Sequence, residues 1–315
     1  MTGCGCWRAR SCAASSRSRR WASPGPPSPH GWPHAAAATT NKEPAMTIPT
    51  PKPLHPSLGA EICGLDLRET LSTEDRAAVA AALAEHLVLV FRDQSFTPAD
   101  YLAACSQLGE PMAQHYSQHN MPGQPMIGRI WHRNGQRPAA MWHTDHTNRE
   151  RPPKATILYG VEIPPEGGDT SFANMRAAWD GLDAEEQQRL AGLRTVNRLD
   201  RHLLDRTLEE DREKYDIPAV HPMMRTHPEH GSKALYFHIS KAHCIKGMTP
   251  EDSQALMQDL LDRTIHDGIV YRHRWRQGDM VVCDNRAAMH RAHGDYDRRH
   301  SRMLWRIILE GDRPA

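Results

Sequence analysis

The sequence has little net charge, no long apolar run and no pattern of paired cysteines, and each shortage excludes a class of protein. Its net charge is +1 over 315 residues, so no overall basic field favours nucleic acid or an anionic membrane. No segment approaches the roughly 18 consecutive apolar residues that a membrane-spanning helix needs. The seven cysteines are odd in number and form no zinc-type pairs, which favours free thiols in a reducing compartment. We therefore expect a cytoplasmic protein that binds neither nucleic acid nor membrane.

The first 45 residues differ in composition from the rest. They contain six basic residues, six prolines and a single acid, Glu43, without any apolar periodicity. Ser18-Arg19-Arg20 is similar to part of a twin-arginine export signal, but no apolar segment follows it. We interpret residues 1–45 as a disordered tail or a mis-assigned gene start, with Met46 as the natural beginning. Residues 46–315 are predicted to form a single domain.

From residue 58 onward the sequence alternates short apolar runs with turn residues. Ser72 and Thr97 have the positions of helix N-caps, and helical patterns also occur near 175–193 and 250–265. Strand patterns occur near 58–67, 87–91, 125–130, 155–161, 170–173, 221–225, 234–239, 268–275, 279–283 and 302–309. The polar stretch 197–220 has little period and is predicted to be a lid or loop. Many short strands with few helices predict a mostly β fold with flanking helices and a closed jelly-roll core.

Candidate metal ligands are found in a histidine-containing triplet. His-x-acid triplets occur at His143-Thr144-Asp145, His227-Pro228-Glu229 and His293-Gly294-Asp295. Composition alone predicts roughly two or three of these, so the triplet by itself indicates nothing. Two imidazoles and one carboxylate are, however, the ligand set of non-haem Fe(II) oxygenases. A second histidine, His290, follows an Asp-Asn-Arg run far downstream of the first triplet.

Several motifs in order carry a resemblance to a known family. They are Val90-Phe91-Arg92-Asp93-Gln94, His143-Thr144-Asp145, Gly167-Gly168-Asp169-Thr170, Trp275 with Gly278-Asp279, Asp284-Asn285-Arg286, His290, and Arg302 with Arg306. Together they resemble the taurine/2,4-dichlorophenoxyacetate dioxygenase family over about residues 54–313. The resemblance implies an Fe(II)- and 2-oxoglutarate-dependent oxygenase on a double-stranded β-helix. It implies a catalytic domain over 46–315, a small anionic organic substrate and O2 as partners, and we expect a homo-oligomer.

The resemblance also implies roles for individual residues. His143, Asp145 and His290 would hold Fe(II), with 2-oxoglutarate and then O2 at the open positions. Arg302, assisted by the Thr170 hydroxyl, would bind the distal carboxylate of 2-oxoglutarate, and Arg306 would face the substrate's anionic group. Because side chains in a strand alternate, Arg302, Leu304 and Arg306 are predicted to share one face of the last strand. A guanidinium fork suits bidentate carboxylate binding at either place.

Each of these assignments has a simpler structural alternative. His143 can be a surface histidine and His290 a loop residue, while Thr170 can merely follow a Gly-Gly turn. Arg302 and Arg306 can be structural salt-bridge partners. His293 is interpreted as a loop residue, and His146 and His227 as pocket or surface histidines.

The sequence departs from the family pattern at three places. Cys283 stands where the family usually has tryptophan, so packing near the iron loop differs. Gln114 and Ala139 stand where taurine enzymes have a histidine and an asparagine that contact substrate, which argues against taurine. Two other functions remain open. One is a metal-dependent hydrolase or isomerase on the same barrel, with the metal activating water; the other is a non-catalytic anion-binding relative.

Overall fold

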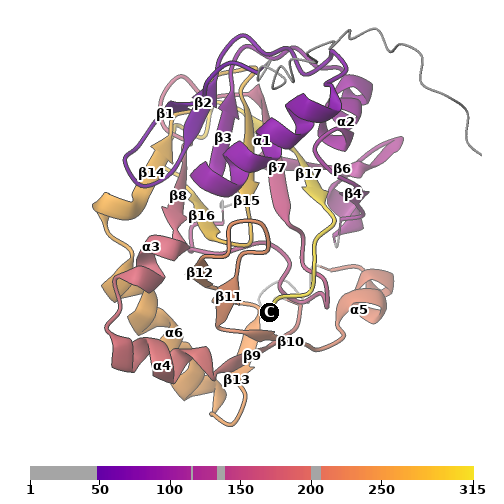
Figure 1. Cartoon of the computed structure of the whole chain (residues 1–315). Coiled ribbons are helices and arrows are strands. Elements are labelled where there is room, and N and C mark those ends of the chain that lie inside the picture. Colours follow the sequence, from indigo (N-terminus) through magenta and orange to yellow (C-terminus); the bar gives the residue numbers. More distant parts are fainter. Residues whose placement is uncertain (1–47, 115, 133–138, 200–206) are drawn as a thin grey trace, which may run out of the picture. The chain divides into compact units, whose positions relative to one another are not determined.

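The computed structural model describes residues 48–114, 116–132, 139–199 and 207–315, shown in colour in Figure 1. Contacts divide the chain into Met1–Glu43 and Pro44–Ala315, and all described residues belong to the second unit. The predicted tail, residues 1–45, lies outside the described residues. Within the described ranges the fold is mostly β with flanking helices, and no helix there is long and apolar enough to cross a membrane.

The regular elements follow one another in short segments. The strands are β1 Lys52–Pro53, β2 Ala60–Ile62, β3 Val88–Phe91, β4 Pro111–Met112, β5 Asn120–Met121, β6 Gln124–His132, β7 Ala155–Glu162, β8 Thr170–Asn174, β9 Arg194–Asn197, β10 Ala219–Pro222, β11 Met224–Thr226, β12 Lys233–Leu235, β13 Ala242–Ile245, β14 Val270–His273, β15 Met280–Asp284, β16 Ala288–Ala292 and β17 Arg302–Leu309. The α-helices are α1 Thr73–His86, α2 Pro98–Ser106, α3 Met175–Asp180, α4 Ala184–Ala191, α5 Glu209–Tyr215 and α6 Pro250–Thr264. Among the described residues, Ser117–His119 and Asp267–Ile269 form 3-10 turns.

Two sheets form the body of the fold. The larger has nine strands in the order β1-β2-β3-β15-β7-β17-β6-β5, with β4 also pairing with β17. The smaller has the order β14-β8-β16. Strands from the end of the chain therefore lie between strands from its first half, as the yellow β15 and β17 do in Figure 1. The sheets β10-β9-β13 and β11-β12 are smaller additions.

The central strands are buried on both faces, which explains why the sequence presents them as continuous apolar runs. In β3, Val88 and Val90 pack into one core cluster with Phe172 of the smaller sheet. Leu89 and Phe91 pack into a second cluster with residues of α1 and α2. Strand β17 alternates in the same way, with Leu304 in the first cluster and Trp305, Ile307 and Leu309 at the second. Arg302 and Arg306 thus share the inner face with Leu304, as predicted.

The predicted helix starts are confirmed. The Ser72 side chain accepts a hydrogen bond from the Asp75 backbone N–H at 3.0 Å and begins α1. Thr97 begins α2 with a complete capping box, and Pro98 occupies the first turn. Such caps satisfy backbone N–H groups that have no partner within the helix. The two helices lie over the outer face of the large sheet (Figure 1).

Three segments differ from the sequence-based expectation. Residues 209–215 of the predicted lid or loop, 197–220, form helix α5, while residues 200–206 lie outside the described ranges. The strand expected over 234–239 ends at Leu235. Ala288–Ala292 is a strand, β16, that the periodicity did not indicate. Its alternation is hard to recognise because Ala288, Met289 and His290 are all buried.

Candidate active site

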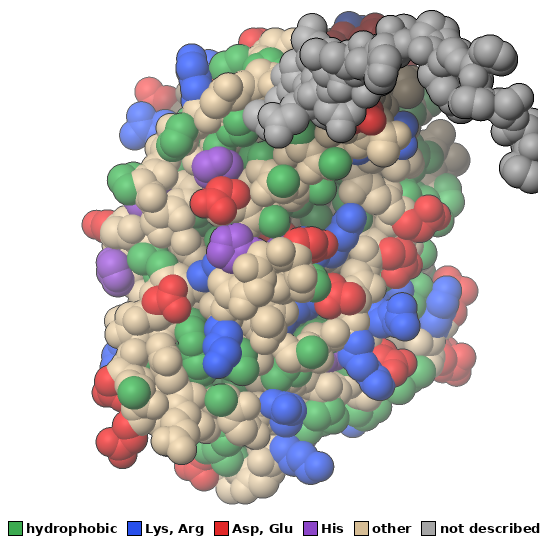
Figure 2. Space-filling view, in the orientation of Figure 1, with side chains coloured by type: hydrophobic (Ala, Val, Ile, Leu, Met, Phe, Trp, Pro, Cys, Tyr) green, Lys and Arg blue, Asp and Glu red, His purple; other side chains and the backbone are tan. Residues whose placement is uncertain are grey.

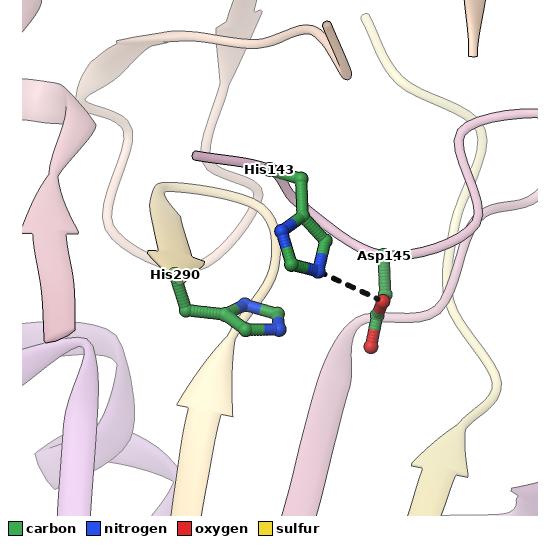
Figure 3. A group of neighbouring side chains, drawn as sticks. All are labelled: His143, Asp145 and His290. Carbon is green, nitrogen blue, oxygen red and sulfur yellow. Dashed lines mark ion pairs between the residues drawn. The ribbon is translucent and has the colours of Figure 1, made fainter. Parts of the chain in front are cut away.

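The two histidines of the predicted triad are brought together by the backbone. His143 lies in the segment before β7, and His290 lies in β16. Their main chains form an isolated antiparallel bridge, with N···O distances of 3.1 Å from His143 to His290 and 2.8 Å in the reverse direction. Ligand atoms of His143, Asp145 and His290 all lie within 4.8 Å of one another. Figure 3 shows the three side chains converging on one space, so they can hold one metal ion.

Neighbouring groups orient two of these side chains. The Met141 carbonyl lies 2.9 Å from His143 Nδ1; if Nδ1 carries the proton, Nε2 is free to bind a metal. The Thr156 hydroxyl donates to Asp145 Oδ2 at 2.7 Å, which leaves Oδ1 available. Asn285 Nδ2 in turn donates to Thr156 Oγ1 at 2.9 Å. His143 and Asp145 therefore have the kind of supporting hydrogen bond that fixes ligands in metal sites, whereas His290 Nδ1 has no partner among the described residues.

Burial and charge set the ionisation of the triad. Burial, together with the neighbouring His143, lowers the pKa of His290 to about 3. The imidazole is then neutral, as a metal ligand must be. Burial alone raises the pKa of Asp145, but the nearby guanidinium of Arg306, with smaller contributions from the neighbouring histidines, outweighs it and holds that pKa well below the usual value. A deprotonated carboxylate and a neutral imidazole match the donor set of a non-haem Fe(II) site.

A double-glycine turn positions the first predicted arginine. Gly167 and Gly168 have φ values of +71°, a region that favours glycine. A Cβ on Gly167 would lie 2.6 Å from the Asp295 carbonyl oxygen, and one on Gly168 would lie 3.1 Å from Arg302 Cδ. The Gly168 carbonyl accepts a hydrogen bond from Arg302 Nε at 2.7 Å. The turn therefore lets the backbone approach and hold this guanidinium.

Arg302 has the properties expected of an anion-binding group. It is 1% exposed, and Nη1 and Nη2 have no hydrogen-bond partner among the described residues. Burial lowers its pKa to about 10, although Tyr296, Asp169 and Asp295 oppose this. A buried guanidinium edge without a partner is costly, and a carboxylate would satisfy both nitrogens.

Thr170 begins strand β8 and is buried. The Trp275 indole N–H donates to its Oγ1 at 3.0 Å. Since that bond uses the oxygen as an acceptor, the hydroxyl hydrogen is free to donate to another group.

Arg306 lies on the same inner face of β17 but already has a neutral partner. Its Nε and Nη2 donate to Gln114 Oε1 at 3.1 and 2.8 Å. Its Nη1 lies 3.8 Å from Asp145 Oδ2. The position that the sequence analysis singled out for substrate contact, Gln114, therefore touches the predicted substrate arginine. The other such position, Ala139, is exposed.

Some histidines are placed differently from the sequence interpretation. His227 is neither in the pocket nor on the surface: its side chain is 0% exposed and its Nε2 lies 3.0 Å from Asp284 Oδ2. Asp284 also binds Arg286, so His227 belongs to a buried ionic network behind the Asp-Asn-Arg run. His146 is buried directly after Asp145, with a left-handed φ of 51°. His293, interpreted as a loop residue, lies outside the strands and contacts Ser171 at 2.8 Å.

Sequence reasoning missed two groups next to the triad. Thr156 was read as part of an apolar strand, although a hydroxyl inside a buried run is itself a signal of a polar contact. His238 gave no signal in the sequence. Its ring centroid lies 5.2 Å from that of His143, and it is buried.

Replacing Thr156 with valine is expected to weaken metal binding without unfolding the protein. The change keeps the shape but removes the hydrogen bond to Asp145, and losing such a supporting contact reduces metal affinity roughly 10- to 100-fold. Titration with Fe(II) under anaerobic conditions would measure this. Thr264→Val, which removes a buried hydroxyl on α6, is the matched control. Equal metal affinity in both variants would contradict the role given to Thr156.

Comparisons with known proteins agree with this geometry. The family model "Taurine catabolism dioxygenase TauD, TfdA family" matches residues 50–308. The alpha-ketoglutarate-dependent 2,4-dichlorophenoxyacetate dioxygenase of Cupriavidus pinatubonensis is 30% identical over 76% of this chain and 90% of that protein. The alpha-ketoglutarate-dependent sulfate ester dioxygenase of Pseudomonas putida is 34% identical over 84% of this chain and 90% of that protein. A crystal structure of a taurine dioxygenase from Burkholderia xenovorans has a TM-score of 0.73 and 35% identity, over 85% and 91% of the two chains.

The family match over residues 50–308 includes the His/Asp/His triad, Thr170, Arg302 and Arg306. Members of this family use Fe(II) and 2-oxoglutarate, and the donor set and the unpaired guanidinium of this chain fit both. The chain belongs to the taurine catabolism dioxygenase TauD/TfdA family and is an Fe(II)- and 2-oxoglutarate-dependent dioxygenase.

Proposed function

We propose that this dioxygenase hydroxylates a C–H bond of a small organic anion: a sulfonate, a sulfate ester or an aryloxy- or alkyl carboxylate. Relatives named for 2,4-dichlorophenoxyacetate and for sulfate esters support this range. Arg306 supports it as well, since it places a cation 3.8 Å from the metal-ligand carboxylate Asp145. When the hydroxylated carbon bears oxygen or sulfur, the product collapses and the group is cleaved.

The observation that carries the proposal is a His/Asp/His triad accompanied by a buried guanidinium with two unpaired nitrogens. We assign His143, Asp145 and His290 to Fe(II). Arg302 and the Thr170 hydroxyl are assigned to the distal carboxylate of 2-oxoglutarate. Arg306 is assigned to the anionic group of the substrate.

Iron and 2-oxoglutarate supply the oxidation: O2 is consumed, 2-oxoglutarate becomes succinate and CO2, and one oxygen atom enters the substrate C–H bond. The residues of the chain bind and orient 2-oxoglutarate and the substrate. Arg302 fixes one end of 2-oxoglutarate, while the inner face of β17 holds the substrate anion through Arg306. Thr156 keeps Asp145 turned so that one carboxylate oxygen is free. The burial of all three ligands excludes bulk water from the reacting centre.

A hydrolase or isomerase on the same barrel is not favoured. Such an enzyme would not need a buried guanidinium with unpaired nitrogens, and the Cupriavidus pinatubonensis and Pseudomonas putida relatives are named as dioxygenases. A non-catalytic relative is not favoured either, because the triad is complete. Screening is the direct test: succinate release should rise with at least one member of a panel of sulfonates, alkyl sulfates and aryloxyalkanoates. Release that no compound stimulates would count against the proposed substrate range.

We also propose that residues 46–315 are one catalytic domain on a double-stranded β-helix, with the sheets that contain β15 and β16 as its two layers. The family match over 50–308 supports these bounds. A protein that begins at Met46 is expected to equal the full chain in activity and melting temperature. A clear loss of either would assign a structural role to the first 45 residues.

We further propose that the protein is cytoplasmic, binds neither nucleic acid nor membranes, and forms a homo-oligomer. The four described cysteines, Cys63, Cys105, Cys244 and Cys283, are free, which supports a reducing cytoplasm. Acidic and basic side chains are interspersed over the face drawn in Figure 2, which supports a protein that does not bind nucleic acid or membranes. We propose that Ile217 and Val220, which are 65% and 54% exposed, contact a second copy of the chain in a homo-oligomer.

A further inference from the structure

A second buried cation, Lys241, lies close to the triad. It follows β12 in the segment before β13, and its residue is 5% exposed. Its backbone N–H donates to the His238 carbonyl at 3.2 Å. The His238 ring in turn packs 5.2 Å from the ring of the metal ligand His143. Lysine is seldom buried to this degree without a negatively charged partner.

The contacts of the Lys241 ammonium are neutral. Its Nζ donates to the Tyr116 hydroxyl at 3.1 Å and lies 5.3 Å from the centre of the Tyr116 ring. No carboxylate of the described residues forms an ion pair with Lys241. The ammonium is therefore buried without a counter-charge among the described residues.

One short segment contacts both cations. Gln114 Oε1 accepts hydrogen bonds from Arg306, and the Tyr116 hydroxyl accepts one from Lys241. The two side chains are two residues apart, so their backbones are separated by no more than about 7 Å. Arg306 and Lys241 are thus hydrogen-bonded to side chains from the same short stretch of chain.

With Fe(II) and 2-oxoglutarate bound, the site has no negative charge left over to neutralise Arg306 and Lys241. In the proposed function the positive charges of Fe(II) and Arg302 equal the negative charges of Asp145 and 2-oxoglutarate. One substrate anion would neutralise Arg306. Lys241 would then still have no ion-pair partner among the described residues. A buried ammonium that lacks a counter-charge is unfavourable, whereas a second substrate anion would form charge-assisted hydrogen bonds with it.

We propose that Lys241 and the Tyr116 hydroxyl form a second anion subsite, and that the enzyme prefers substrates with two negative groups. The inference rests on the proposed function, since it assigns the first anion to Arg306. The dianionic substrate has its acidic groups at opposite ends, with the reacting carbon near the end that Arg306 holds. A single-anion substrate is bound as well, but more weakly.

Binding to an inert complex tests the subsite directly. The protein is loaded with Mn(II) and N-oxalylglycine, an analogue with NH in place of a CH2 of 2-oxoglutarate, so that no dianionic probe enters the co-substrate site. Calorimetric titration then compares phenoxyacetate with its 3-carboxy and 4-carboxy derivatives. We expect one carboxylated probe to bind roughly ten- to a hundredfold more tightly than phenoxyacetate.

Variants identify the group responsible. Lys241→Met keeps the length of the side chain without its charge and should remove the preference, with phenoxyacetate binding almost unchanged. Tyr116→Phe should reduce the preference partially. Lys246→Met, at an exposed lysine just after β13, is the matched control and should keep it. Melting temperatures verify that each variant is folded.

The outcomes separate this inference from the proposed function. Equal affinity for all three probes overturns the inference alone, as does a preference that survives Lys241→Met. If no probe binds and none stimulates succinate release, the proposed substrate range fails and the inference fails with it.

Discussion

Replacing Asp145 with alanine is expected to abolish Fe(II)-dependent turnover while leaving the fold intact. Asp145 is the carboxylate of the triad, and its Oδ1 is left free by the Thr156 contact to Oδ2. Loss of a supporting contact alone costs roughly 10- to 100-fold, so loss of the ligand itself should exceed that range. Succinate release and anaerobic Fe(II) titration would measure the effect.

A suitable control is Asp297→Ala, which removes an exposed carboxylate paired with Arg299. It should match the unaltered enzyme in both measurements. Circular dichroism and the melting temperature should be similar for all three proteins, because the backbone bridge between His143 and His290 does not depend on Asp145. Activity retained by Asp145→Ala would remove the basis for assigning the triad to the metal.

Replacing each β17 arginine with glutamine is expected to affect two different ligands. Arg302→Gln removes the guanidinium whose Nη1 and Nη2 are unpaired, so the affinity for 2-oxoglutarate should fall roughly ten- to a hundredfold. Arg306→Gln should raise KM for the primary substrate and change 2-oxoglutarate binding little. It should also release succinate without forming hydroxylated product. Steady-state kinetics with each ligand varied in turn would measure both constants.

Two results from the Arg302→Gln and Arg306→Gln variants would contradict these assignments. If Arg306→Gln weakens 2-oxoglutarate more than Arg302→Gln does, the two assignments are reversed. If neither variant changes either constant, β17 does not supply the ligand contacts. Lysine is not expected to replace arginine at these positions. Its ammonium is a point charge, whereas the planar guanidinium binds a carboxylate through two hydrogen bonds.

The sequence predicted those parts of the molecule in which local signals are strong. The caps at Ser72 and Thr97 were recognisable because a small polar side chain precedes each helix. Alternation in β17 placed Arg302 and Arg306 on one face because that strand separates two cores. The triad was recognisable only through several motifs in order, since a single His-x-Asp triplet has no meaning by itself.

Other parts depend on contacts between distant segments, which no local pattern records. Lys241 reads as one polar residue among others, and only folding places it against Tyr116 and His238. His227 is buried in contact with Asp284, a residue far away in the sequence that also binds Arg286. Strand β16 was missed because it is buried on both faces, so its residues do not alternate between polar and apolar types.

The order of strands in the large sheet has a consequence for synthesis on the ribosome. Strand β15 pairs with β3 and β7, and β17 pairs with β7 and β6, so the last strands made complete a sheet begun by the first. While the final residues are still inside the ribosome, the inner edges of β3, β6 and β7 have no partners. Such edges can pair with other chains. The nascent protein is therefore expected to need chaperone protection until translation ends, and a chain that stops before Arg302 should aggregate rather than form a smaller domain.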